Sequence, residues 1–162
     1  MPAAGSGSAL PKRHGNSMAE TSVKLLHCEL ATAGLLKIDQ VGSGVGVVIY
    51  SPLQKVGVGL HILAPFSGSI ASKNPLMYAN TAIPHAMELL ARKGVKPPFS
   101  VAIAGGASLL KCQTAMGSSQ RMIDAVKTAL TKAALNVKLE STGGAKVRSI
   151  TLDIDAGKIR IE

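Results

Sequence analysis

The pattern that most constrains the fold is a glycine-dense turn that runs directly into an apolar segment. Gly42-Ser43-Gly44-Val45-Gly46-Val47 leads into the largely β-branched run from Val45 to Tyr50, which is typical of a strand buried on both faces. Ser51-Pro52 ends this strand, and residues 56–63 predict a neighbouring strand that carries His61. A fold can use this arrangement to place a nucleophile opposite its general base.

The candidate base is present in this arrangement, but the nucleophile is missing because residue 44 is glycine. The glycine pattern is not followed by the Lys-Ser/Thr of a P-loop. It also enters a strand rather than a helix, so no helix N-terminus is available for a phosphate. Taken alone, the turn indicates a tight bend that another backbone approaches closely. A lone histidine in an apolar strand, such as His61, is more often structural than catalytic.

The remaining periodicity predicts an α+β fold. Apolar residues at helical spacing predict amphipathic helices over residues 80–93 and 119–134. Connections of hairpin length favour α+β over a doubly wound parallel sheet. About eight short strands are expected, over residues 22–30, 35–38, 45–50, 56–63, 100–104, 137–140, 147–153 and 158–161. Residues 1–20 lack periodicity and are expected to form a flexible tail or a leader before a single domain over residues 21–162.

Composition and charge narrow the class of function. The formal charge of +9 comes from 18 Lys and Arg against 9 Asp and Glu. The basic residues are dispersed and only 2% of residues are aromatic, which disfavours nucleic acid as a partner. Cys28 and Cys112 lie far apart and the histidines are scattered, so we expect no metal site and no cofactor. No apolar run is long enough for membrane insertion, and we expect a cytoplasmic protein.

Five short motifs follow one another along the chain. They are Gly42-Ser43-Gly44-Val45-Gly46-Val47, Gly59-Leu60-His61-Ile62-Leu63-Ala64-Pro65, Tyr78-Ala79-Asn80-Thr81-Ala82, Ile103-Ala104-Gly105-Gly106-Ala107-Ser108, and Thr142-Gly143-Gly144 leading to Arg148-Ser149. In this order and spacing they resemble the CheD family, the chemoreceptor glutamine deamidases of bacterial and archaeal chemotaxis. The resemblance covers residues 21–162.

The resemblance implies a fold of stacked β-sheets flanked by helices, a sandwich shared with some cysteine-hydrolase toxins. It also implies hydrolysis of selected glutamine side chains of chemoreceptors to glutamate. Members of the family use a cysteine nucleophile, a histidine base and a threonine that orients the histidine. The partners implied are the cytoplasmic region of a chemoreceptor and a CheC-type phosphatase, which competes with receptors for the same face.

Carried onto this sequence, the resemblance places the base at His61, the nucleophile at Gly44 and the orienting threonine at Ile38. Two of the three catalytic side chains are therefore absent, and we expect a catalytically inactive homologue that retains binding. The binding positions implied by the motifs are Ser43, Tyr78, Gly105, Gly106, Thr142, Gly143 and Arg148.

Two other functions remain open at this point. One is an active deamidase with a displaced nucleophile, for which Cys112 is the most plausible thiol. The other is a binding or scaffold module outside chemotaxis that uses the space left at Gly44, since a fold does not fix a function.

Overall fold

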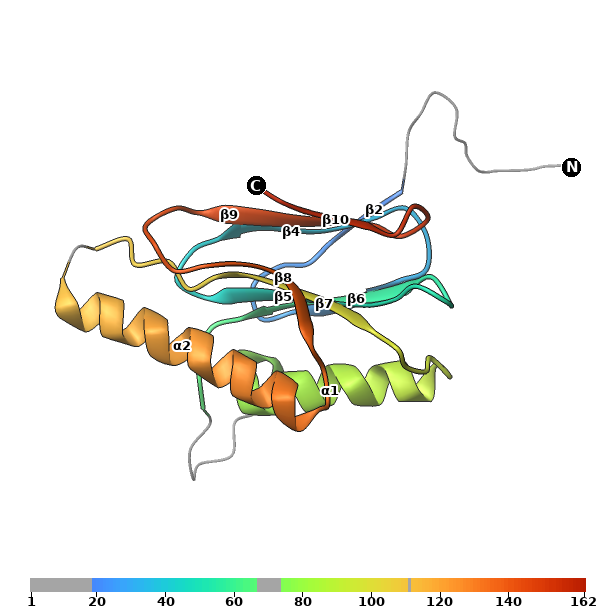
Figure 1. The fold of residues 1–162 in the computed structure, drawn as a ribbon, viewed down its shortest axis with the longest axis horizontal. Coiled ribbons are helices and arrows are strands. Elements are labelled where there is room, and N and C mark those ends of the chain that lie inside the picture. Colours follow the sequence, from blue (N-terminus) through green and yellow to red (C-terminus); the bar gives the residue numbers. More distant parts are fainter. Residues whose placement is uncertain (1–18, 67–73, 111) are drawn as a thin grey trace, which may run out of the picture.

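The molecule has three layers: two stacked β-sheets and a layer of two helices on the free face of one sheet (Figure 1). The computed structural model describes residues 19–66, 74–110 and 112–162. The expectation of an α+β fold with stacked sheets and two main helices is confirmed. Within the described ranges, neither helix is long and apolar enough to span a bilayer.

The outer sheet has four strands in the order β10-β9-β4-β2, and the central sheet has five in the order β3-β6-β5-β7-β8. The outer strands are β2 (Glu20–Ser22), β4 (Leu35–Val41), β9 (Arg148–Asp153) and β10 (Lys158–Ile161). The central strands are β3 (Cys28–Ala31), β5 (Val45–Ser51), β6 (Val56–Ile62), β7 (Ser100–Gly105) and β8 (Val137–Thr142). The helical layer holds α1 (Ala79–Arg92) and α2 (Gln113–Lys132), with a short 3-10 turn, η3 (Pro75–Met77), before α1.

One predicted strand is wrong in a way that matters for the topology. The segment expected as a single strand over residues 22–30 forms β2 and β3, which belong to different sheets. Leu26 adopts a positive φ of 66°, and this left-handed residue turns the chain from one sheet to the other. Of the tail expected over residues 1–20, residues 1–18 lie outside the described residues, and Glu20 already belongs to β2.

Apolar side chains fill the space on both sides of the central sheet. Val47, Leu60 and Ile62 pack against the helices, whereas Val48 and Ala102 pack against the outer sheet. β5 is buried along its whole length, as its continuous apolar sequence predicts.

β6 divides its side chains strictly between these two spaces, because successive side chains of a strand point to opposite faces. Val58, Leu60 and Ile62 face the helices, so Gly57, Gly59 and His61 face the outer sheet. His61 therefore projects into the space between the two sheets, near the end where the β4–β5 turn and the start of α2 lie (Figure 1).

Candidate functional site

His61 is the buried ionisable side chain at the centre of the candidate site. It lies near the end of β6 opposite Gly46 of β5, and only 7% of its surface is exposed. Its Nδ1 atom has no hydrogen-bond partner among the described residues. Burial lowers the pKa of the imidazole below its ordinary value, because a charged ring is poorly solvated there. The neutral ring therefore holds a buried nitrogen atom without a partner in the described part of the chain.

Residue 44 lies directly beside this ring. A Cβ atom placed on Gly44 would lie 3.7 Å from Cδ2 of His61. The same atom would also lie 2.5 Å from the backbone oxygen of Ile62, which is closer than such atoms normally approach. The position implied for the nucleophile is thus next to the base, but the backbone has closed against β6 so that glycine fits best.

The position implied for the orienting threonine lies on the opposite wall, in the outer sheet. Ile38 is fully buried. Its Cγ2 and Cδ1 atoms would lie 3.3 Å and 3.5 Å from Cβ atoms placed on Gly46 and Gly59, respectively. These two glycines flank His61, one across the strand pair and one along β6. An isoleucine here packs well but offers no oxygen atom to the imidazole.

A β-bulge in β4 brings polar side chains to the same end of the space between the sheets. The pairing of β4 with β9 shifts register between Ile38 and Val41, and Gln40 has a positive φ of 55°. The bulge places two residues between two inward-facing ones, and Asp39 and Gln40 line the cavity at His61. Bulges of this kind commonly re-aim side chains beside functional sites.

These residues surround a cavity of about 620 Å³, which we call the His61 cavity. Its size lies within the range of about 300–1,000 Å³ that is common for ligand sites. The lining residues are Ser22, Val23, Lys24, Leu25, Asp39, Gln40, Gly42, Ser43, Gly44, His61, Leu63 and Leu109. Sequence reasoning missed Lys24, Asp39, Gln40 and Leu109. Only Asp39-Gln40 carried a signal, because two successive polar residues interrupt an otherwise alternating strand.

Most of the predicted binding residues gather at the ends of β7 and β8. Gly105 pairs with Thr142, and the Gly143 amide donates to the Gly105 carbonyl at 3.0 Å. Arg148 donates to the same carbonyl at 3.5 Å. The Gly106 amide donates to the Gly44 carbonyl at 2.7 Å, which joins this group to the candidate site.

The other two predicted binding residues lie apart from this group. Ser43 is exposed and lines the His61 cavity. Tyr78 precedes α1, where it forms an isolated bridge with Ala64, and it does not line the cavity. The structure therefore brings Ser43 to His61 but leaves Tyr78 outside.

Neither cysteine occupies the position of the missing nucleophile. Cys28 pairs with Leu60 and packs against the helix-side core, so it lies on the face of the central sheet opposite to His61. Burial and the charge of Glu29 raise the pKa of the Cys28 thiol to about 11, which disfavours the reactive thiolate. Cys112 is exposed at the start of α2 and is not part of the cavity lining.

Comparisons with a family model and with individual proteins identify the same family. The model of the family described as CheD, CheD chemotactic sensory transduction, matches residues 64–162, a range that begins after His61. The chain is 37% identical over 123 residues to the probable chemoreceptor glutamine deamidase CheD of Methanococcus vannielii, covering 75% of this chain and 80% of that protein. It is 35% identical over 129 residues to the chemoreceptor glutamine deamidase CheD of Thermotoga maritima, covering 79% and 81%.

Proposed function

The chain belongs to the CheD family, and from this premise we propose that it binds a chemotaxis partner without deamidating it. The partner is the cytoplasmic region of a chemoreceptor or a CheC-type phosphatase, bound at the His61 end of the molecule. The observation that carries the proposal is the glycine at position 44, beside the buried imidazole.

Deamidation through a covalent intermediate requires a nucleophile at this position. A thiolate attacks the amide carbon, the C–N bond breaks as ammonia leaves with a proton from the base, and water then hydrolyses the thioester to the carboxylate. Gly44 supplies no sulfur atom, and Ile38 supplies no hydroxyl to orient His61. Loss of a nucleophile typically lowers the rate by several orders of magnitude, so a binding role is the better match to these residues.

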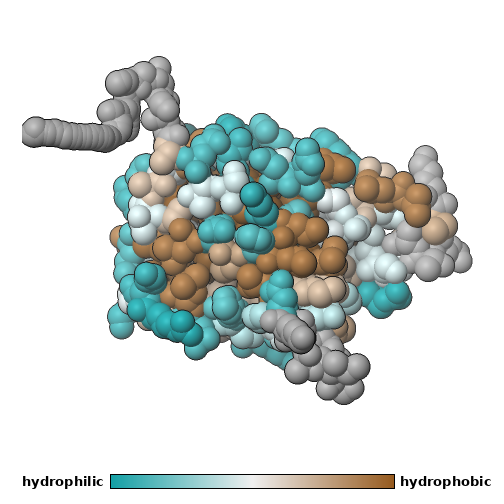
Figure 2. Space-filling model, turned by 180° about the vertical axis from the view of Figure 1, so that it is seen from behind, coloured by the Kyte–Doolittle hydropathy of each residue, from teal (hydrophilic) through white to brown (hydrophobic). Residues whose placement is uncertain are grey.

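The surface around the His61 cavity suits binding. Leu25, Leu63 and Leu109 line the cavity and are each at least 40% exposed. Hydrophobic surface is visible across the middle of the face in Figure 2 and at the end from which α2 begins. Exposed apolar groups around a cavity are typical of an interaction site. The excess of basic residues, 18 against 9 acidic ones, favours an acidic partner.

The test is ammonia release from a chemoreceptor cytoplasmic fragment, with binding measured in parallel by calorimetry. The wild type is expected to bind the fragment and to release no ammonia. Binding is expected to weaken as salt rises, because exposed charges are screened. Ammonia release by the wild type contradicts the proposal, and loss of that release in Cys112→Ala would then identify a displaced nucleophile. Absence of binding to both the receptor fragment and a CheC-type phosphatase also contradicts it.

Variants that restore the missing side chains sharpen the test. Gly44→Cys alone is expected to stay inactive and to lose stability, because its Cβ atom meets the Ile62 carbonyl. Gly44→Cys combined with Ile38→Thr replaces both lost groups, and Gly44→Cys with Ile38→Val is its matched control. Activity only in the threonine combination would show that the site lost these two groups together.

A further inference from the structure

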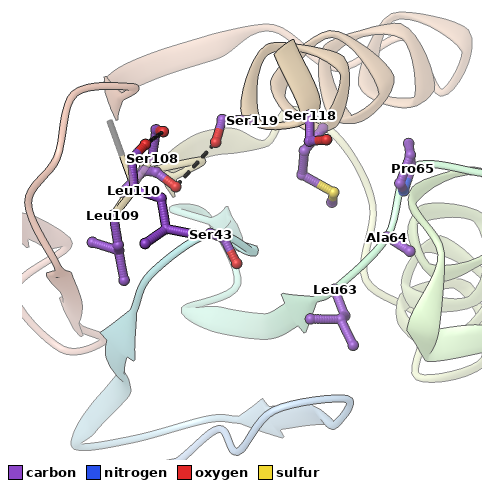
Figure 3. A pocket seen from close by; sticks show the side chains of 11 residues that line it. Ser43, Leu63, Ala64, Pro65, Ser108, Leu109, Leu110, Ser118 and Ser119 are labelled. Atoms are coloured by element: carbon purple, nitrogen blue, oxygen red, sulfur yellow. Dashed lines mark hydrogen bonds between the residues drawn. The ribbon is translucent and has the colours of Figure 1, made fainter. Parts of the chain in front are cut away.

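A second hollow adjoins the His61 cavity, and we call it the side hollow. Its volume is about 380 Å³. Figure 3 shows Leu109 and Leu110 on one side of it, Ala64 and Pro65 on the other, and Ser118 and Ser119 of α2 above. The full lining is Ser43, Leu63, Ala64, Pro65, Ala107, Ser108, Leu109, Leu110, Ser118, Ser119 and Met122.

Three of the four serines that line the side hollow form hydrogen bonds within the protein through their hydroxyl groups, and the fourth is Ser43, which also lines the His61 cavity. Ser119 donates to the Ala107 carbonyl at 3.0 Å, and Ser108 donates to the Leu110 carbonyl at 2.7 Å. Ser118 accepts a hydrogen bond from Arg121 at 3.1 Å. A ligand would therefore meet mainly the carbon atoms of the leucines, alanines, Pro65 and Met122. This lining favours apolar groups over polar ones, because a polar group would lose its water and find few partners in exchange.

The His61 cavity has the opposite preference. Lys24, Asp39, Gln40 and Ser43 bring polar side chains to its lining, so a polar group that enters the cavity finds hydrogen-bond partners there. Ser43, Leu63 and Leu109 line both hollows. The two hollows thus share walls, and one bound segment can enter both with neighbouring side chains.

The charges at the rim indicate the sign of the occupant. Lys24 lines the His61 cavity, and Arg121 reaches the rim of the side hollow at Ser118. Asp39 is the acidic residue in the lining of the two hollows. An acidic segment therefore complements this end of the molecule better than a basic one.

We propose that the side hollow is a subsite for apolar side chains of an acidic amphipathic partner segment, whose adjacent polar side chain enters the His61 cavity. This inference rests on the proposed binding function and specifies what the partner must present. Leu110 is 70% exposed in the free protein, and its contact with the partner would cover it. Anchors of this kind, apolar side chains set beside one polar contact, are common in recognition of amphipathic segments.

The subsite itself is tested with small probes, independently of any partner. N-acetylleucinamide, titrated into protein with 13C-labelled methyl groups, is expected to shift the signals of Leu110 and Met122. Leu53, which is 77% exposed beyond β5, serves as the control signal. N-acetylglutaminamide is the matched polar probe and is expected to leave Met122 unshifted. Equal shifts at Leu53, or no shift at Met122, overturn the proposal.

Two variants test whether the probe binds in the side hollow. A third variant, with a leucine-to-serine change outside the hollow, is the control. Leu110→Ser removes an exposed apolar side chain from the lining and is expected to weaken binding of the leucine probe about threefold or more. Ser118→Phe fills the hollow from the exposed side of α2 and is expected to abolish its binding. Leu53→Ser is expected to change nothing. Unaltered affinity in both Leu110→Ser and Ser118→Phe overturns the proposal.

The same variants are then titrated with the chemoreceptor cytoplasmic fragment and with a CheC-type phosphatase. Weaker binding of a partner by Leu110→Ser and Ser118→Phe, but not by Leu53→Ser, supports the subsite in its proposed role. Equal binding of a partner by all four proteins overturns it. If the leucine probe occupies the side hollow but neither partner binds the wild type, the proposed function fails while the subsite stands.

Discussion

The space between the two sheets is closed at one end and open at the other, and β6 contributes to both ends. At the closed end, Gly57 faces the outer sheet so closely that a Cβ atom there would lie 2.5 Å from Cδ2 of Leu152. The Tyr50 hydroxyl donates to the Ile154 carbonyl at 2.6 Å across the same gap. At the open end, the same face of β6 carries His61 beside a cavity of about 620 Å³.

The two ends therefore differ in role: the closed end stabilises the fold, whereas the open end forms the candidate site. The closed end joins the sheets through tight packing, and substitutions there are expected to be costly. At the open end, the bulge after Ile38 brings Asp39 and Gln40 to the lining of the cavity, so several residues there face a cavity rather than an opposing side chain. Substitutions of residues that line this cavity are therefore expected to cost less stability than substitutions at the closed end.

The largest effect is expected when a leucine at each end is replaced by alanine and the losses in the free energy of unfolding are compared. Leu152 is fully buried at the closed end, whereas Leu109 is 56% exposed at the open end. Leu152→Ala is expected to lower the free energy of unfolding by about 3 kcal/mol. Leu109→Ala is expected to change it by less than about 0.5 kcal/mol. Urea denaturation of the two variants measures both values, and similar losses would contradict the contrast between the ends.

The next largest effect concerns a buried hydroxyl group, which we expect to lower stability more at the closed end than at the open end. Ile38→Thr and Ile38→Val have nearly the same shape, and so do Ile154→Thr and Ile154→Val. At Ile154, fully buried against Gly57, threonine is expected to cost about 1–3 kcal/mol more than valine, because its hydroxyl has no free partner.

Ile38 lies beside Gly46 and Gly59, the two glycines that flank His61. We therefore expect a threonine hydroxyl at position 38 to reach the Nδ1 atom of His61, which has no partner among the described residues. A hydrogen bond between them should reduce the difference between threonine and valine to less than about 0.5 kcal/mol. Urea denaturation of the four variants gives the two differences. An equal penalty at both positions would show that residue 38 does not reach the imidazole.

The regular parts of the molecule could be predicted from the sequence because their patterns are local. The apolar run of β5 predicts a doubly buried strand, and the stripe of apolar residues predicts α1 to within one residue at each end. Less regular segments were harder to predict. α2 begins at Gln113 rather than at residue 119, because its first turns, which include Gly117, carry no apolar stripe for the periodicity to detect.

The candidate site was predictable only in part, because it depends on contacts between distant segments. His61, Gly44 and Ile38 follow from the family resemblance, and the structure places them around one space. The bulge that turns Gln40 into the cavity depends on the pairing of β4 with β9. Lys24 enters the lining only because the chain turns between β2 and β3, and no local pattern indicates that turn.

The smallest effect is a pH dependence of the free energy of unfolding that arises from His61 at the open end. Because burial lowers the pKa of His61 in the folded protein, the unfolded chain takes up this proton at a higher pH than the folded chain does. Stability from this group is therefore present above the ordinary histidine pKa of about 6.5 and is lost as pH falls. Between pH 7.5 and 6 the loss is expected to reach up to about 0.8 kcal/mol.

His61→Leu should remove this part of the pH dependence, and His85→Leu on α1 is the matched control that should keep it. Lys24 and Asp39 also line the cavity, but both remain in each variant, so the difference between the variants isolates the imidazole. The measurement is the free energy of unfolding in urea at a series of pH values. If the wild type and His61→Leu lose stability in parallel, the ring is not held neutral by burial, and the open end is wetter than its 7% exposed histidine implies.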